Sequence, residues 1–294
     1  MFQARSRRAI RDCALVLQSA GIPHTVVADG RGAQLVVERR YADAARAELV
    51  DYGEENHDWP PSAVAAPPRK TWGAAGALVY GFVIVVVFWL QRAQPFGLDW
   101  DPVGVMHAGA ARSGEWWRPW TALTMHVDAN HLISNLVFGA VFAVVASMSL
   151  GSGVVWLGTV LAGALGNAIE TFIVDASHRG VGASTALFGT LGLMTAAEWA
   201  RRGTETSPWV RRVAPLFGGA VLFGWLGGGA GSPRVDVLAH ALGFAVGAVL
   251  GLGVARAKLA QRLGPRGQML FCAIAILAVA AAWALGFAAT GVPR

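Results

Sequence analysis

Residues 73–91 read GAAGALVYGFVIVVVFWLQ, a run of nineteen residues without one acidic or basic side chain. About 20 apolar residues in an α-helix are long enough to cross the hydrocarbon core of a bilayer. Comparable runs recur along the chain, and we expect seven transmembrane helices near residues 73–91, 132–150, 153–174, 183–200, 211–228, 236–254 and 268–289. The sequence therefore predicts an all-α polytopic membrane protein.

The composition of the chain supports this class. Of its 294 residues, 54% are apolar and only 14% are charged, whereas a soluble domain carries roughly 25% charged residues. The 12 Trp and 37 Gly suit bilayer interfaces and close helix packing. The formal charge of +6 is explained by basic residues on cytoplasmic loops. We expect the lipid bilayer as a partner and no nucleic acid.

Basic residues also predict the orientation of the helices, because Lys and Arg collect on cytoplasmic connections. Two connections, after the fourth and sixth predicted spans, each hold four of them: Arg201, Arg202, Arg211 and Arg212, then Arg256, Lys258, Arg262 and Arg266. This pattern places the amino terminus in the cytoplasm and the carboxyl terminus outside. We expect a multi-pass protein of the cell membrane, and the Ala, Gly and Arg content suggests a bacterial inner membrane.

The segment before the first span has a different pattern. ALVLQSAG (residues 14–21) and YADAARAELVDYG (residues 41–53) predict helices, and HTVVADGRGAQLVVE (residues 24–38) predicts two strands around a turn. Residues 1–60 are therefore expected to form a small cytosolic αββα module. A Pro/Ala-rich linker, residues 61–72, follows it.

Four polar residues stand at the beginning of predicted spans that all enter from the outer side. His131 and Asn135 begin the second span, Ser184 the fourth and His240 the sixth. Because polar groups at membrane depth are costly, their shared depth predicts a functional site. His131 and Asn135 are four residues apart and so share one helical face. Taken alone, Ser184 could be a helix-packing residue and Asn135 an interhelical hydrogen-bonding group.

The sixth span carries small residues at a regular spacing. His240, Gly243, Gly247 and Gly251 fall along one stripe of the predicted helix. Glycines at this spacing allow two helices to approach closely. If the fourth span is the neighbour, the Ser184 hydroxyl comes within reach of the imidazole.

These residue types suit nucleophilic catalysis. A serine hydroxyl is a weak nucleophile until an adjacent base takes its proton, and histidine titrates in the useful range. His131, Asn135 and the Ser184 N–H could donate hydrogen bonds to the oxyanion of a tetrahedral intermediate. The catalysis needs water, which predicts a polar cavity open to the outside.

Four further patterns stand out along the chain: WWR (116–118), HVDANHLISN (126–135), GASTALFG (182–189) and HALGFAVG (240–247). Together these segments resemble the signatures of the rhomboid family of intramembrane serine proteases. The resemblance covers roughly residues 73–254, which it implies to be a six-helix catalytic core. Residues 255–294 then form a connecting loop and a seventh transmembrane helix.

The resemblance implies cleavage of transmembrane segments of other proteins near the outer leaflet, with Ser184 as nucleophile and His240 as base. His131 and Asn135 match the pair that stabilises the oxyanion. The supporting positions that match are Phe188 against the imidazole, Trp117 and Arg118 in the first loop, His126 before the second span, and Gly182 and Gly243 in the motifs. Thr185 departs from the family pattern, in which Gly follows the serine. A β-branched residue lacks the backbone freedom of Gly, so we expect a helical backbone around Ser184.

Other interpretations remain open on the sequence. A silent rhomboid relative would bind clients without cutting them, and a transporter would use His131, His240 and Glu170 as a proton relay. We expect Asp236 to cap the sixth span and Glu170 and Asn167 to make structural contacts. The lone Cys13 and Cys272 and the absence of a His-Glu-x-x-His motif predict neither a metal site nor a cofactor.

Overall fold

A computed structural model describes residues 2–4, 7–29, 32–57, 73–202 and 236–291, together with residues 214 and 218. The chain divides into two compact units, Met1–Pro68 and Arg69–Arg294.

The amino-terminal unit is a small α+β module. Its elements are β1 (Phe2–Ala4), α1 (Arg7–Ser19), β2 (His24–Asp29), β3 (Gly32–Val37), a 3₁₀ turn (Arg39–Tyr41) and α2 (Ala42–Glu55). The strands form an antiparallel sheet in the order β1-β3-β2, and Ile10, Leu17 and Leu35 lie in its core.

One strand of this module was missing from the predicted αββα order. β1 adds to the free edge of β3, where Phe2 stands opposite Leu35. The sequence FQA is too short to show the alternation of apolar and polar residues that predicts a strand.

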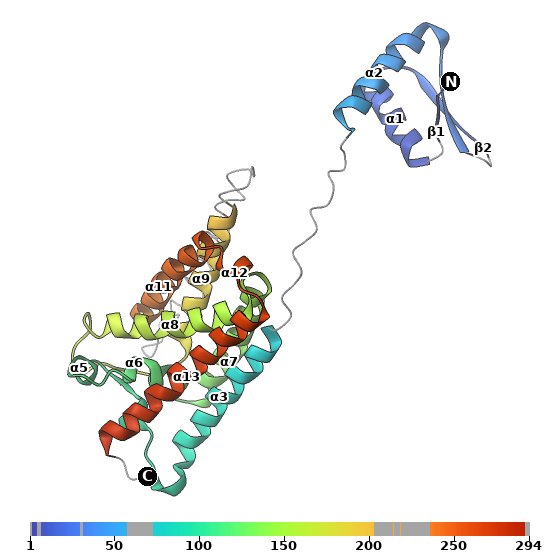
Figure 1. Cartoon of the computed structure of the whole chain (residues 1–294). Helices are drawn as coiled ribbons and strands as arrows, with labels where there is room; N and C mark the ends of the chain where they lie inside the picture. The colour runs from blue at the N-terminus through green and yellow to red at the C-terminus, as the bar shows by residue number, and fades with distance from the viewer. Residues whose placement is uncertain are drawn as a thin grey trace. The chain divides into compact units, whose positions relative to one another are not determined.

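The second unit is a bundle of helices (Figure 1). Its long members are α3 (Gly73–Ala93), α7 (Ala129–Leu150), α8 (Ser152–Glu170), α9 (Ser184–Arg202), α11 (Val237–Arg256) and α13 (Pro265–Thr290), and the short α12 (Leu259–Arg262) joins the last two. Among the described residues, all of these long helices except α9 are long and apolar enough to cross a membrane. The chain is therefore a multi-pass helical membrane protein.

The fourth predicted span forms α9, but this helix is more polar than the other five. It packs against α8 and α11 and carries buried threonines. One of them, Thr190, makes a 2.7 Å hydroxyl contact with Thr159 of α8. A helix that its neighbours shield from lipid does not need an apolar surface all round. The fifth predicted span, residues 211–228, falls outside the described residues.

The long connection from α3 to α7 folds into short elements. They are 3₁₀ turns at Pro95–Gly97 and Ala122–Thr124, the helices α4 (Asp101–Gly104), α5 (Ala108–Arg112) and α6 (Arg118–Thr121), and β4 (Met106–His107), which pairs with β5 (Arg179–Gly180). The buried Arg118 guanidinium donates to the carbonyls of Val105 (2.6 Å) and Pro102 (2.7 Å). The Trp117 indole donates to the carbonyl of Val103 (3.2 Å). Both side chains therefore hold this connection together.

The seventh predicted span, α13, packs on α8, α4 and α6 and belongs to the same compact unit as the other helices. Near its beginning, the Gln268 side-chain oxygen accepts hydrogen bonds from the N–H groups of Gly153 (2.8 Å) and Val154 (3.1 Å) in the first turn of α8. Near its end, the Trp283 indole donates to the hydroxyl of Thr124 in the long connection, at 3.1 Å. α13 therefore supports both α8 and the connection that precedes α7.

Candidate active site

One cavity of about 1140 Å³ lies among the ends of five helices. Its walls come from the end of α3, the beginning of α7, the end of α8 and the beginnings of α9 and α11. The lining includes six of the residues predicted to form the catalytic site or support it: His131, Asn135, Gly182, Ser184, Phe188 and His240. The fold thus brings together residues that are more than 100 positions apart along the chain.

Ser184 is the first residue of α9, and the chain reaches it through a glycine with an unusual backbone. Gly182 has φ +136°, and a Cβ built there would lie 2.6 Å from the His131 ring. The same Cβ position is 3.5 Å from the Ser184 hydroxyl. Only glycine fits, because both the backbone angle and the space exclude a side chain. The missing side chain at Gly182 therefore leaves room for the His131 ring near Ser184.

His240 lies one turn into α11 and is 7% exposed. Asp236 caps this helix, as the sequence predicted, by accepting a hydrogen bond from the Ala239 N–H at 3.0 Å. The ring centroids of His240 and Phe188 are 4.4 Å apart. Because Phe188 is one turn after Ser184 on α9, the imidazole lies over the helical face that carries the serine.

The helices α9 and α11 touch through their backbones. A Cβ added at Gly243, Gly247 or Gly251 would collide with the carbonyl oxygen of Thr185, Gly189 or Leu193, in that order. These three glycines are buried. The expected seam is therefore confirmed, and α9 is the helix that fits against it.

Thr185 fits this arrangement without a glycine's freedom. The helix begins at Ser184, so the expected helical backbone around the serine is confirmed. Thr185 is 4% exposed, and its methyl group lies in the space beside Gly166 and Gly243. A β-branched side chain thus fills a gap between three helices, α8, α9 and α11.

The opposite wall of the cavity belongs to α7. Its cap, Asp128, accepts a hydrogen bond from the His131 N–H at 2.8 Å. Asn135 is 5% exposed, and its backbone carbonyl accepts a hydrogen bond from the Tyr80 hydroxyl at 2.9 Å. Its side-chain Nδ2 is buried and has no hydrogen-bond partner within the described part of the chain. A buried unpaired donor is costly, so this amide is available for a ligand in the cavity.

His126 lies behind His131 rather than in the cavity wall. It is fully buried, and its ring centroid is 5.2 Å from that of His131. Neither ring nitrogen has a hydrogen-bond partner among residues that the structure describes. Burial, with a smaller contribution from His131, lowers the pKa of His126 to about 4. Of the other predicted supporting residues, Trp117 and Arg118 also lie outside the cavity lining, in the connection described above.

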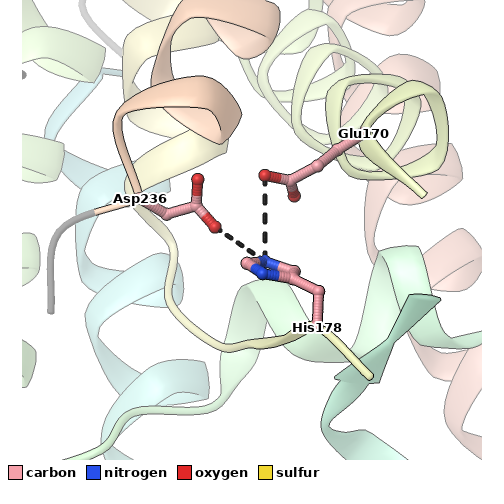
Figure 2. A group of neighbouring side chains, drawn as sticks. All are labelled: Glu170, His178 and Asp236. Atoms are coloured by element: carbon pink, nitrogen blue, oxygen red, sulfur yellow. Dashed lines mark hydrogen bonds and ion pairs between the residues drawn. The ribbon is translucent and has the colours of Figure 1, made fainter. Parts of the chain in front are cut away.

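A second polar group lines the same cavity and was only partly anticipated. Glu170 and Asp236 were named separately in the sequence analysis, and His178 was not named. The His178 ring lies 2.9 Å from Asp236 and 3.9 Å from Glu170 (Figure 2). Burial would raise the pKa of Asp236, yet the hydrogen bond from Ala239 and the neighbouring Glu170 and His178 hold it below its usual range. No local motif could reveal this group, because its members come from three separate segments.

Similarity to known proteins agrees with this multi-pass membrane fold. Residues 113–257 match the Rhomboid domain. The Bacillus subtilis (strain 168) protein named "Putative rhomboid protease YdcA" is 28% identical over 168 residues, which cover 57% of this chain and 81% of that protein. These two similarities support the rhomboid family for this chain. At the level of the family, membership indicates an intramembrane protease that acts on membrane-protein substrates.

Proposed function

We propose that this protein is an intramembrane serine endopeptidase that cleaves transmembrane segments of other membrane proteins. The observation that carries the proposal is the cavity itself. It collects the Ser184 hydroxyl and the His240 imidazole from two helices in backbone contact, and it faces them with the unpaired Asn135 amide. This is the set of groups that acyl transfer needs.

In the proposed reaction, His240 takes the Ser184 proton as the hydroxyl oxygen attacks the scissile carbonyl. The tetrahedral oxyanion accepts hydrogen bonds from Asn135 Nδ2, from the His131 ring and from the Ser184 N–H. His240 then protonates the leaving amine, and an acyl-enzyme forms. Water from the cavity, activated by the same imidazole, hydrolyses the acyl-enzyme and returns the proton to Ser184.

The supporting residues have positioning roles in this proposal. Phe188 holds the His240 ring by contact, which takes the place of a third catalytic carboxylate. Gly243 allows α11 to reach Thr185 at the beginning of α9, and Gly182 allows the chain to pass the His131 ring. His126 backs the His131 ring.

The distribution of basic residues supports a location for the reaction. With the amino terminus in the cytoplasm of a bacterial cell and the protein in its inner membrane, the beginnings of α7, α9 and α11 face outward. The cavity then lies near the outer leaflet, where water and a substrate helix both have access. A silent client-binding protein fits less well, because both Ser184 and His240 are present. A proton-coupled transporter is disfavoured because the sequence shows no internal repeat between its two halves.

The test is fluorophosphonate labelling of the full-length protein in detergent. Wild type should be labelled, Ser184→Ala should not, and His240→Ala should label at least roughly 10³-fold more slowly, because the base is lost. The matched control is Ser134→Ala, since Ser134 lines the same cavity and donates only to the His131 carbonyl. It should label as wild type does.

Labelling that persists in Ser184→Ala would overturn the assignment of the nucleophile. Cleavage of a model transmembrane substrate in proteoliposomes separates a protease from a silent binder. Wild type should cleave, and a wild-type protein that binds the substrate without cutting it would refute the proposed activity.

A further inference from the structure

Three ligand-type side chains from the cavity lining converge on one another (Figure 2). Glu170 is the last residue of α8, His178 lies in the connection before β5, and Asp236 caps α11. The His178 Nε2 is 2.9 Å from one Asp236 oxygen and 3.9 Å from Glu170 Oε1. One donor atom from each residue lies within 4.8 Å of the other two.

Glu170 gives an independent reason to expect a ligand here. Its side chain is 3% exposed, and its Oε1 has no hydrogen-bond partner in the described residues. Figure 2 shows this carboxyl group pointing toward His178 and Asp236. A buried carboxylate is costly unless it is paired or coordinates a metal, and a second carboxylate beside it raises this cost.

We propose that Glu170, His178 and Asp236 bind one divalent first-row metal ion, with Zn²⁺ the best fit. A neutral imidazole and two carboxylates bring two negative charges, which the ion would neutralise. Tetrahedral Zn²⁺ with bonds of about 2.0–2.2 Å places its ligand atoms about 3.4 Å apart. The separations in this cluster bracket that value, so small side-chain movements complete the site.

The donor set also decides between classes of metal ion. Ca²⁺ prefers six to eight oxygen ligands, and Mg²⁺ an octahedron of oxygens. One imidazole and two carboxylates suit Zn²⁺ better, with the fourth position left to water from the cavity. The sequence predicted no metal site, because spacings of eight and fifty-eight residues form no ligand motif.

At this position, a bound ion would cross-link segments close to the proposed catalytic residues. Asp236 is one turn before His240, and His178 is six residues before Ser184. A bound ion would join α8 to the segments that lead to the two residues of the proposed dyad. It would therefore fix this part of the cavity wall.

The experiment measures metal content and does not depend on peptidase activity. The full chain, purified in detergent through a tag without histidines, is stripped with a chelator, dialysed against Zn²⁺ and analysed by inductively coupled plasma mass spectrometry. Wild type should hold one Zn²⁺ per chain. Glu170→Gln, His178→Gln and Asp236→Asn should each weaken Zn²⁺ binding at least roughly tenfold, because each removes a ligand. Asp175→Asn is the control, since Asp175 is an exposed carboxylate in the same connection that accepts hydrogen bonds from Ser177; it should bind like wild type.

Two further measurements distinguish a loss of Zn²⁺ binding from misfolding and from a failure of the proposed peptidase activity. Asp236→Asn retains an acceptor for the helix cap, so it should fold, and Zn²⁺ should raise the unfolding temperature of wild type but not of this variant. Ser184→Ala should bind Zn²⁺ as wild type does, so a failure of the proposed peptidase leaves this result intact. A wild-type chain that binds no Zn²⁺, or variants that bind it equally well, would overturn the site.

Discussion

The two walls of the cavity are built in different ways. On one side, α9 and α11 meet backbone to backbone, with carbonyl oxygens of α9 lying where side chains of α11 would otherwise stand. On the other side, α7 is held by side chains, through the Tyr80 hydroxyl on the Asn135 carbonyl and the edge-on contact between the rings of His126 and His131.

The two walls should therefore respond differently to substitution. Backbone contact leaves no side chain to rotate, so the spacing between Ser184 and His240 is fixed once the helices have packed. Side-chain contacts can be removed one at a time, so single substitutions should lower the stability of the wall that carries Asn135 and His131 in small steps. Substitutions on the first wall should therefore act abruptly, and those on the second gradually.

The largest effect is expected from Gly247→Leu in the glycine seam. The new side chain meets the Gly189 carbonyl, which cannot move without displacing α9. We expect a loss of about 3 kcal/mol in the free energy of unfolding and loss of fluorophosphonate labelling. Gly253→Leu is the matched control on the same helix, because a Cβ at Gly253 meets nothing within 4 Å. Equal stability of the two variants would show that the backbone contact is unimportant.

An intermediate effect is expected from pH, through His126 behind the second wall. Its folded pKa of about 4 is below the ordinary value of 6.5, so the unfolded chain binds the additional proton. Stability is therefore complete above pH 6.5 and falls as the pH drops toward 4. Between pH 8 and pH 5 the loss should be roughly 2 kcal/mol, measured by chemical unfolding in detergent.

The variant His126→Gln removes this proton-binding group, and its pH dependence should be correspondingly flatter. His107→Gln is the control, because His107 is only half-buried and its Nδ1 accepts a hydrogen bond from Ala110. It should keep the wild-type slope. If His126→Gln keeps that slope as well, burial of His126 is not the cause.

The smallest effect is expected from Tyr80→Phe. This change removes the hydrogen bond to Asn135 and keeps the aromatic contact with Trp156, whose ring centroid is 5.4 Å away. One interhelical hydrogen bond in a membrane contributes about 0.6 kcal/mol. We expect a decrease of that size in the free energy of unfolding and a small decrease in labelling rate. A loss as large as that of Gly247→Leu would erase the contrast between the walls.

The sequence predicted much of this architecture because membrane helices have a simple physical signature. Apolar length located α3, α7, α8, α11 and α13, and the spacing of Gly243, Gly247 and Gly251 predicted a close helix contact. The cluster of Glu170, His178 and Asp236 could not be predicted, because it depends on the tertiary placement of three segments. The three-residue strand β1 was missed for a related reason, since it depends on pairing with β3. The catalytic roles of the residues in the cavity stay predictions until the labelling experiment is done.

The contacts of α13 bear on how this protein can be shortened for biochemical work. The match to the Rhomboid domain ends at residue 257, ahead of Gln268 and Trp283. A fragment cut at that point would lack the side chain that satisfies the first amides of α8 and the indole that anchors Thr124. The boundaries of a family domain are therefore a poor guide to a minimal active fragment here, and expression should retain the chain through Thr290.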